Sequence, residues 1–248
     1  MAARVYGHPV WPLEDQPVGS SITSDERKEN GKFIAWNFYQ IGFKYQACCG
    51  VVSAIANESN VDPCAREDGG PGLGFIQNSL SSLPRIFENY GYKMPRDWLN
   101  LTANCYAQVA QLVHRLTTWG SWARPAQREF NEDTQAWEIV GHPSINSRYE
   151  LSQEELKNST DPAAVAGSIA VMMEHPYGVN KVYGYYGDPV GTSADLENAV
   201  RGYTRLAYTV QSWFSEDDLR HYAPPVIEYG THSKLLYYLR PWWQRIGR

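Results

Sequence analysis

Two adjoining stretches of the sequence decide the fold: ACCGVVSAIANESNVDP at residues 47–63 and GGPGLGFIQ at residues 69–77. The first is rich in Ala and Val and predicts a helix at about residues 45–59, with Glu58 in its last turn. The second lies in a loop of Pro, Gly and Asp that spans residues 60–78. An acidic side chain therefore stands where an apolar helix gives way to a glycine-rich loop.

The position of Glu58 suits a general acid. At the end of an apolar helix we expect its carboxyl group to lie in a medium of low dielectric constant, beside the negative pole of the helix. Both effects disfavour the anion and should raise the pKa of Glu58, as proton donation near neutral pH requires. The position alone does not assign catalysis, because a glutamate at a helix end is more often a solvated terminal residue.

The complete pattern resembles that of a known family. Helix, Glu-Ser, Asp-Pro and a glycine-rich loop closing in Gly-Φ-Φ-Gln (Φ apolar) is similar to the goose-type lysozyme and lytic transglycosylase superfamily. Within it, the chain most resembles the phage tail lysozymes, in particular the lysozyme domain at the tail knob of short-tailed phages. The family pattern is Ala-x-x-Gly-Φ-Φ-x-Asn-Φ-x-x-Glu-Ser-x-Φ-Asn-Pro. The residues that match it without a gap are Ala47, Gly50, Val51, Val52, Ile55, Glu58, Ser59, Val61 and Pro63, whereas Ala54 and Asp62 replace two asparagines.

A second block supports the resemblance, which covers about residues 28–178. The family has a helix that ends in Tyr-Glu-Arg-Pro, and here residues 163–172 lead into Met173-Glu174-His175-Pro176. The chain departs from the family at Met173, at His175 and at Asn78, which follows the loop glutamine where relatives have Trp. These departures concern the wall of the substrate cleft and leave Glu58 unchanged.

The resemblance implies a mainly α, goose-type lysozyme-like domain that cleaves the β-1,4 bond between N-acetylmuramic acid and N-acetylglucosamine in peptidoglycan. Glu58 would protonate the bridging oxygen while the anomeric carbon becomes oxocarbenium-like. Glu67 and Asp68 are candidates for a second carboxylate that activates water. We prefer Asp68 for its place beside the flexible glycines, although a solvated loop acid is the commoner role. Goose-type relatives often lack a defined second carboxylate, so none need be present.

Substrate binding is assigned to the loop that follows the helix. Glycines allow its backbone to approach a long polymer closely, and the side-chain amide of a glutamine can bond an acetamido group. The residues assigned to this role are Gln77, Ser59 and Gly74. Trp119, Trp122 and Trp137 could floor a sugar subsite, but packing or an interface is the more common role for each.

The family also implies a place of action. We expect an enzyme carried in the virion, at the phage tail, that helps penetrate the host cell wall during entry and contacts other tail proteins. An alternative is a structural tail protein that keeps the lysozyme-like fold without the activity, and a chitinase-like hydrolase is a second. The sequence leaves open whether the glycosidic bond is cleaved by water or by transglycosylation within the sugar, which gives a 1,6-anhydro product.

Composition excludes several other classes of protein. The formal net charge is −5 and there is no basic tract, which argues against nucleic-acid binding. A freely diffusing lysozyme gains from positive charge on an anionic wall, whereas one delivered by a particle does not need it. We expect no nucleotide or other cofactor, no metal site and no membrane insertion, because the corresponding motifs and apolar runs are absent. The opening MAARVYGHP lacks an apolar h-region, so we expect no cleaved signal peptide.

Along the chain we expect an irregular arm at residues 1–22, a catalytic domain at 23–214 and an aromatic extension at 215–248. The predicted helices begin with a cap at Thr23 or Ser24 and lie at about residues 24–41, 45–59, 80–90, 103–118, 161–174 and 194–214. Residues 119–151 are irregular in pattern, and at most a small β-hairpin is expected, within 60–78 or 177–193. The extension either anchors the enzyme or completes its core. The four cysteines are expected to be buried and reduced.

Overall fold

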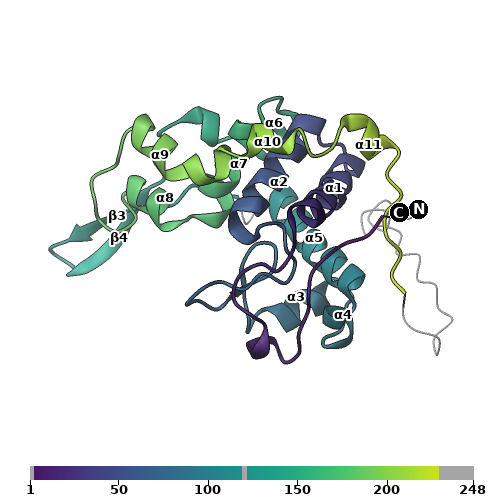
Figure 1. Cartoon of the computed structure of the whole chain (residues 1–248). Coiled ribbons are helices and arrows are strands. Elements are labelled where there is room, and N and C mark those ends of the chain that lie inside the picture. Colours follow the sequence, from purple (N-terminus) through teal and green to yellow (C-terminus); the bar gives the residue numbers. More distant parts are fainter. Residues whose placement is uncertain (1–2, 119–121, 229–248) are drawn as a thin grey trace, which may run out of the picture. The chain divides into compact units, whose positions relative to one another are not determined.

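The computed structural model describes residues 3–118 and 122–228 of the 248-residue chain (Figure 1). Its helices are α1 (Ser24–Gln40), α2 (Tyr45–Ser59), α3 (Leu83–Asn89), α4 (Arg96–Leu99), α5 (Leu101–Thr117), α6 (Gln153–Asn158), α7 (Pro162–Ile169), α8 (Tyr177–Val182), α9 (Ser193–Thr204), α10 (Ala207–Val210) and α11 (Glu216–Arg220). Short 3₁₀ turns η1 (Leu13–Asp15) and η3 (Ser147–Tyr149) and a π-helical turn η4 (Ala170–Glu174) complete the helical set. The mainly α fold class is confirmed.

Two small antiparallel sheets are present in the part of the chain described. One pairs β1 (Gly72–Leu73) with β2 (Asn78–Ser79), and the other pairs β3 (Gln127–Asn131) with β4 (Ala136–Gly141). The first sheet lies at the end of residues 60–78, one of the two regions in which a small hairpin was expected. The second lies in residues 119–151, for which an irregular structure was predicted, and residues 177–193 contain no strand in this structure.

The chain forms two compact units. Of the residues described, the first unit comprises 3–42, 55–114 and 212–228, and the second comprises 43–54, 115–118 and 122–211. The boundaries at 54/55 and 114/115 fall inside α2 and α5, so each of these helices belongs partly to both units.

The helix that contains Glu58, α2, begins and ends where the sequence predicts, because the residues that set its limits lie close to it in the sequence. Thr23 caps the preceding helix α1 in a capping box with Glu26, and Gly42, with φ of 88°, ends that helix by donating to the Tyr39 carbonyl. Helix α2 then begins at Tyr45. Its residues 47–56 are all buried, as expected for a helix that is apolar on every side.

The core of the first unit gathers side chains from segments far apart in the sequence. Its buried residues are Leu13, Cys64, Leu73, Leu83, Phe87, Tyr92, Trp98, Ala103, Ala107 and Ile227. Ile227 belongs to the C-terminal extension, and α11 of the same extension packs against α1. Residues 215–228 therefore complete this core. The extension's Tyr229, Tyr237, Tyr238, Trp242 and Trp243 lie outside the described residues, as does Trp119.

The second unit is built around α7, all of whose residues are buried. Asp161 caps α7 by accepting hydrogen bonds from the backbone of Ala163 and Ala164. Helices α9 and α10 and the turn η3 pack against α7. Gly167 on α7 has no room for a Cβ, which would lie 2.3 Å from the Tyr149 ring, so the close approach requires glycine.

Three predicted helices differ from those observed. The helix expected at 80–90 begins at Leu83, because residues 78–79 are used by β2. The long helix expected at 194–214 is interrupted between α9 and α10, although Arg205 and Leu206 keep right-handed helical angles. The helix expected to run to 174 changes from α to π geometry at Ala170. Helix α6 was not predicted, although the capping box of Ser152 and Glu155 marks its N-terminus in the sequence.

The cysteines are as predicted: Cys48, Cys49, Cys64 and Cys105 are all buried and free. Burial raises the pKa of the Cys49 thiol to about 12, so it remains protonated near neutral pH. None of the helices described has the length and hydropathy needed to span a membrane.

Candidate active site

Glu58 lies in the last turn of α2, in the first unit, and is half-buried. The residue before it, Asn57, is exposed, whereas Ser59 is buried. The hydroxyl of Ser59 donates to the carbonyl of Ile55, 3.1 Å away, so this hydroxyl is already used within the helix. The carboxyl group therefore stands at the boundary between an apolar helix and solvent.

The chain leaves α2 through two left-handed residues, Asn60 and Val61, with φ of 56° and 61°. Such a conformation is costly for a β-branched residue, and Val61 is also fully buried. The buried amide of Asn30 donates to the Val61 carbonyl at 3.0 Å and to the Tyr6 carbonyl at 2.8 Å. Asn30 thus holds the strained turn immediately after Glu58.

Asp62, which stands where the family has asparagine, fastens the next part of the loop. Its buried carboxylate accepts hydrogen bonds from the Ser21 and Cys64 backbone amides at 3.0 and 2.8 Å. It also accepts one from the Ser20 hydroxyl at 3.1 Å. The carboxylate therefore joins the loop to the N-terminal arm and is a structural group, and the sequence pattern gave no sign of this.

The two candidate second carboxylates differ in their surroundings. Glu67 accepts a hydrogen bond from the Gly72 backbone amide at 3.0 Å and so closes the turn before β1. A Cβ at Gly70 would lie 2.1 Å from that carboxylate, so a larger residue there would displace the Glu67 side chain. Asp68 is exposed, has no hydrogen-bond partner among the residues described, and precedes Gly69, whose φ is 70°. Of these two acids, Glu67 uses a carboxylate oxygen to bond the loop, whereas neither carboxylate oxygen of Asp68 is hydrogen-bonded to the described residues of the loop.

The structure brings Gly74 and Gln77 together. The side-chain nitrogen of Gln77 donates to the Gly74 carbonyl at 2.9 Å, while its side-chain oxygen is buried and has no hydrogen-bond partner within the described part of the chain. Its donor group is therefore engaged by the loop itself, and only the carbonyl oxygen remains to be satisfied. The expected bond from Gln77 to an acetamido group remains a prediction.

A row of amide side chains on α5 supports the loop. This row was not predicted from the sequence. Gln108 is fully buried, accepts from the Phe75 backbone amide at 2.7 Å and donates to the Pro63 carbonyl at 2.7 Å. Gln111 forms two hydrogen bonds with Asn78, at 2.7 and 2.9 Å. Asn78, where relatives have Trp, is thus part of this support. The available signal was a polar row at residues 104, 108 and 111 beside the apolar face of the helix.

The second family block lies in the second unit. Glu174 forms an ion pair with Arg115, with 3.6 Å between nitrogen and oxygen, and Arg115 also donates to the Met173 carbonyl at 3.0 Å. His175 follows in the left-handed conformation, and its ring contacts the Ala123 carbonyl at 2.7 Å. Burial lowers the pKa of His175, so its neutral form is favoured. Glu174 is therefore fixed by a cation at the point where the chain turns.

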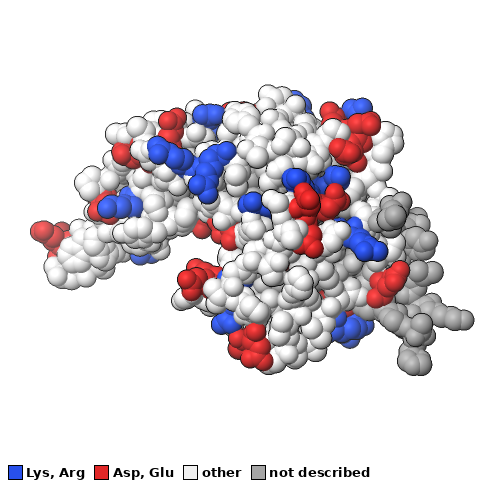
Figure 2. Space-filling model, in the orientation of Figure 1, with Lys and Arg blue, Asp and Glu red and all other residues white. Residues whose placement is uncertain are grey.

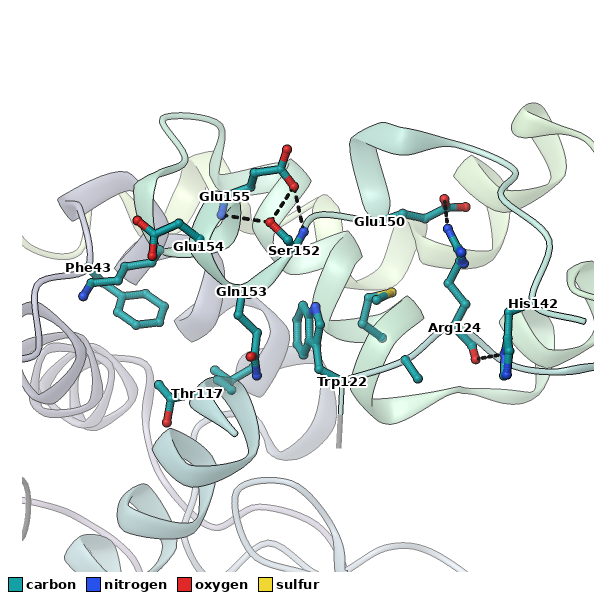
Figure 3. Close-up of a pocket in the computed structure, with 14 residues that line it drawn as sticks. Phe43, Thr117, Trp122, Arg124, His142, Glu150, Ser152, Gln153, Glu154 and Glu155 are labelled. Carbon is teal, nitrogen blue, oxygen red and sulfur yellow. Dashed lines mark hydrogen bonds and ion pairs between the residues drawn. The ribbon is translucent and has the colours of Figure 1, made fainter. Parts of the chain in front are cut away.

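The second unit also contains a cavity of about 800 Å³ (Figure 3). Trp122 lines it and is fixed by a hydrogen bond from its indole nitrogen to the Leu151 carbonyl at 2.9 Å. Glu150 also lines it, and its side chain, only 2% exposed, is paired with Arg124. Burial alone would raise the pKa of Glu150, but hydrogen bonds from Ser144, Ile145, Tyr183 and Asn146 lower it to about 2. Trp122 is one of the tryptophans that could floor a sugar subsite, whereas the predicted catalytic and loop residues do not line this cavity: Glu58, Asp68, Gln77, Ser59 and Gly74.

In the residues that the structure describes, no group of three or more His, Cys, Asp or Glu side chains is arranged to hold a metal ion.

The fold is mainly helical with two small antiparallel sheets in the part described, which is consistent with a lysozyme-like protein. The sequence model of the phage tail lysozyme family matches residues 29–184, which is well over half of the chain. The chain belongs to the phage tail lysozyme family, and this assigns it a lysozyme-like action on peptidoglycan at the family level. No curated protein matches the chain.

Proposed function

We propose that this protein is a peptidoglycan glycosidase that cleaves the β-1,4 bond between N-acetylmuramic acid and N-acetylglucosamine, with Glu58 as the general acid. The observation that carries the proposal is the place of Glu58. It lies half-buried in the last turn of α2, inside the family match, and next to a loop fastened by Asn30, Asp62 and Gln108.

The mechanism requires Glu58 to hold a proton until the glycosidic oxygen is in place. A carboxyl group near the C-terminal pole of a helix and partly removed from water is disfavoured as an anion. On transfer of the proton to the bridging oxygen, the bond to the anomeric carbon breaks and positive charge develops on the sugar ring. The hydrogen-bonded loop holds the Glu58 carboxyl group and the glycan strand in a fixed relative position, because none of the supporting hydrogen bonds needs to rearrange.

Asp68 is the residue that we assign to the water-activating role. Its carboxylate is exposed and uncommitted, whereas that of Glu67 is used by the Gly72 amide. A water molecule held by Asp68 would attack the anomeric carbon from the face opposite the leaving group. Without such a base, attack by the sugar's own 6-hydroxyl would give the 1,6-anhydro product, so the product distinguishes the two mechanisms.

We place the enzyme on the phage tail, where it would open the host cell wall during entry beside other tail proteins. The family is the support for this placement. The net charge of −5 agrees with delivery by a particle rather than by free diffusion to an anionic wall.

The rival function is a structural tail protein that keeps the fold without activity. The observation that favours it is Asn78, which replaces a family tryptophan and is paired with Gln111, away from a role in holding sugar.

The decisive experiment compares the intact chain with its Glu58→Gln variant on purified peptidoglycan. We expect the variant to lose at least about a hundredfold in activity, because a neutral amide cannot donate the proton, with an unchanged melting temperature. Zymography measures the loss, and mass spectrometry of the released muropeptides separates hydrolysis from the 1,6-anhydro reaction. Undiminished activity in Glu58→Gln would remove Glu58 from the mechanism. An inactive wild-type chain would favour the structural rival.

A further inference from the structure

The β3–β4 hairpin carries three large apolar side chains, Phe130, Trp137 and Ile139, on one face. The register pairs Phe130 with Trp137 and Arg128 with Ile139, and since side chains two residues apart share a face, these four lie together. The rings of Phe130 and Trp137 meet at 5.5 Å between centroids, yet the residues are 45% and 52% exposed. The hairpin projects beyond α8 and α9 of the same unit (Figure 1).

Trp137 is supported from one side by a glycine. A Cβ at Gly187 would lie 2.0 Å from the indole, and the φ of Gly187 is 82°, so both the contact and the turn require glycine. The indole thus rests on backbone on one side and is open on another. A ring fixed in this way loses little conformational entropy when a ligand stacks on it.

Three tyrosines extend the surface. Tyr186 contacts both Tyr177 and Tyr185, with 5.2 Å between ring centroids in each case. Tyr177 is 68% exposed and Tyr186 is 47% exposed. The guanidinium of Arg128 lies 4.4 Å over the Tyr185 ring. We call the set Phe130, Trp137, Tyr177, Tyr185, Tyr186 and Arg128 the aromatic face.

Arg128 is the cation of the aromatic face. Among residues 3–118 and 122–228, no carboxylate forms an ion pair with Arg128. Of the acids on the hairpin, Glu132 and Asp133 lie in the turn at its tip, where Figure 2 shows acidic side chains. Glu129 and Glu138 pair with each other in the register and lie on the face opposite Arg128. The face therefore offers flat rings with polar edges together with one unpaired positive charge.

We propose that the aromatic face is a second binding site for the glycan strand of peptidoglycan, separate in role from the chemistry at Glu58. The apolar faces of successive sugar rings stack on Trp137 and the tyrosines, and Arg128 meets a carboxylate of the lactyl group or its peptide. A chain of net charge −5 gains no long-range attraction to an anionic wall, so its retention needs short-range contacts of this kind. The substrate class rests on the proposed function.

The test measures binding rather than cleavage. The full-length Glu58→Gln chain is sedimented with purified, insoluble peptidoglycan in the cold, and its Kd is compared with that of the same chain carrying Trp137→Ala. We expect Trp137→Ala to raise the Kd by about tenfold or more, the usual effect of removing a central aromatic contact. Trp11→Ala is the matched control, because Trp11 is 42% exposed but belongs to the first unit, and it should leave the Kd unchanged.

Two further variants keep the proposal testable if Trp137→Ala disturbs the hairpin. Tyr177→Ala removes the most exposed ring of the face and should weaken binding severalfold. Arg128→Gln should weaken binding to peptidoglycan but not to a neutral N-acetylglucosamine oligomer, with binding to the oligomer followed by tryptophan fluorescence. Circular dichroism verifies that each variant is folded.

An unchanged Kd in folded Trp137→Ala and Tyr177→Ala variants would overturn the proposal. So would variants that bind the wall normally but lose self-association in analytical ultracentrifugation, because the face would then be a protein interface. Failure here is distinguishable from failure of the proposed function. Release of muropeptides by the wild-type chain tests the function alone, and sedimentation with intact peptidoglycan tests the aromatic face alone.

Discussion

The loop after Glu58 and the β3–β4 hairpin are both small antiparallel sheets, but they are stabilised in opposite ways. Strands β1 and β2 have only two residues each, yet Gly72, Leu73 and Gly74 are buried and the loop is bonded to side chains of α5. Strands β3 and β4 are longer, but most of their residues are exposed or half-buried. Strand length therefore does not decide which sheet is anchored to the rest of the fold. Buried hydrogen bonds from side chains of α5 anchor the loop after Glu58.

The difference matches the roles that we propose for the two regions. A loop beside a catalytic acid must keep its geometry within a fraction of an ångström, which buried and fully bonded groups provide. A surface that holds a long, flexible polymer needs open rings and tolerates small movements.

The largest effect on stability should come from Gln108. Replacing Gln108 by Leu leaves the buried Phe75 amide and Pro63 carbonyl without partners, and we expect a loss of about 3 kcal/mol in the free energy of unfolding. Urea denaturation measures it. Ile139→Ser on the hairpin is the comparison, since Ile139 is 64% exposed, and it should change stability by less than about 0.5 kcal/mol. Equal losses in the two variants would contradict the contrast.

A slightly smaller effect should depend on pH and arise from Glu150. The chain leaves the hairpin through residues 144–146, which donate hydrogen bonds to Glu150. Its folded-state pKa of about 2 lies below the ordinary 4.5, so the anion stabilises the fold above pH 4.5 and this stability is lost as pH falls towards 2. The linked free energy is about 2 kcal/mol, because solvent screening reduces the effect of the pKa shift.

Glu150→Gln should therefore lower stability at pH 7 and flatten the acid side of the stability curve between about pH 5 and pH 2. Thermal unfolding at a series of pH values provides the measurement. Glu132→Gln, at the exposed tip of the hairpin, is the control and should leave the curve unchanged. An acid limb of wild-type steepness in Glu150→Gln would show that other groups govern it.

The smallest effect should be on activity, at the two acids of the loop. Asp68→Asn should lower kcat/KM for peptidoglycan hydrolysis by about tenfold, if its carboxylate positions water. Glu67→Gln should stay close to wild type, because the amide oxygen can still accept from the Gly72 backbone. Initial rates of muropeptide release measure both. Near-wild-type rates in both variants would instead support a one-carboxylate mechanism or the 1,6-anhydro reaction.

From the sequence alone we predict the helix at residues 45–59 with Glu58 in its last turn, a cap of α1 at Thr23 or Ser24, and the family. These features depend on residues within a few positions of one another, such as the capping box of Thr23 and Glu26. Local hydrogen bonds and apolar spacing are visible in one pass along the chain.

Only the tertiary structure decided how the loop is held and where the aromatic side chains go. Gln108 finds its partners 33 and 45 residues away, and Trp137 rests on Gly187, 50 residues further along. The β3–β4 turn contains neither glycine nor proline and is closed by Asn131, whose side chain accepts from the Asp133 and Thr134 amides. Such contacts depend on which distant segments are packed together, and packing follows from the burial of the whole chain rather than from local pattern.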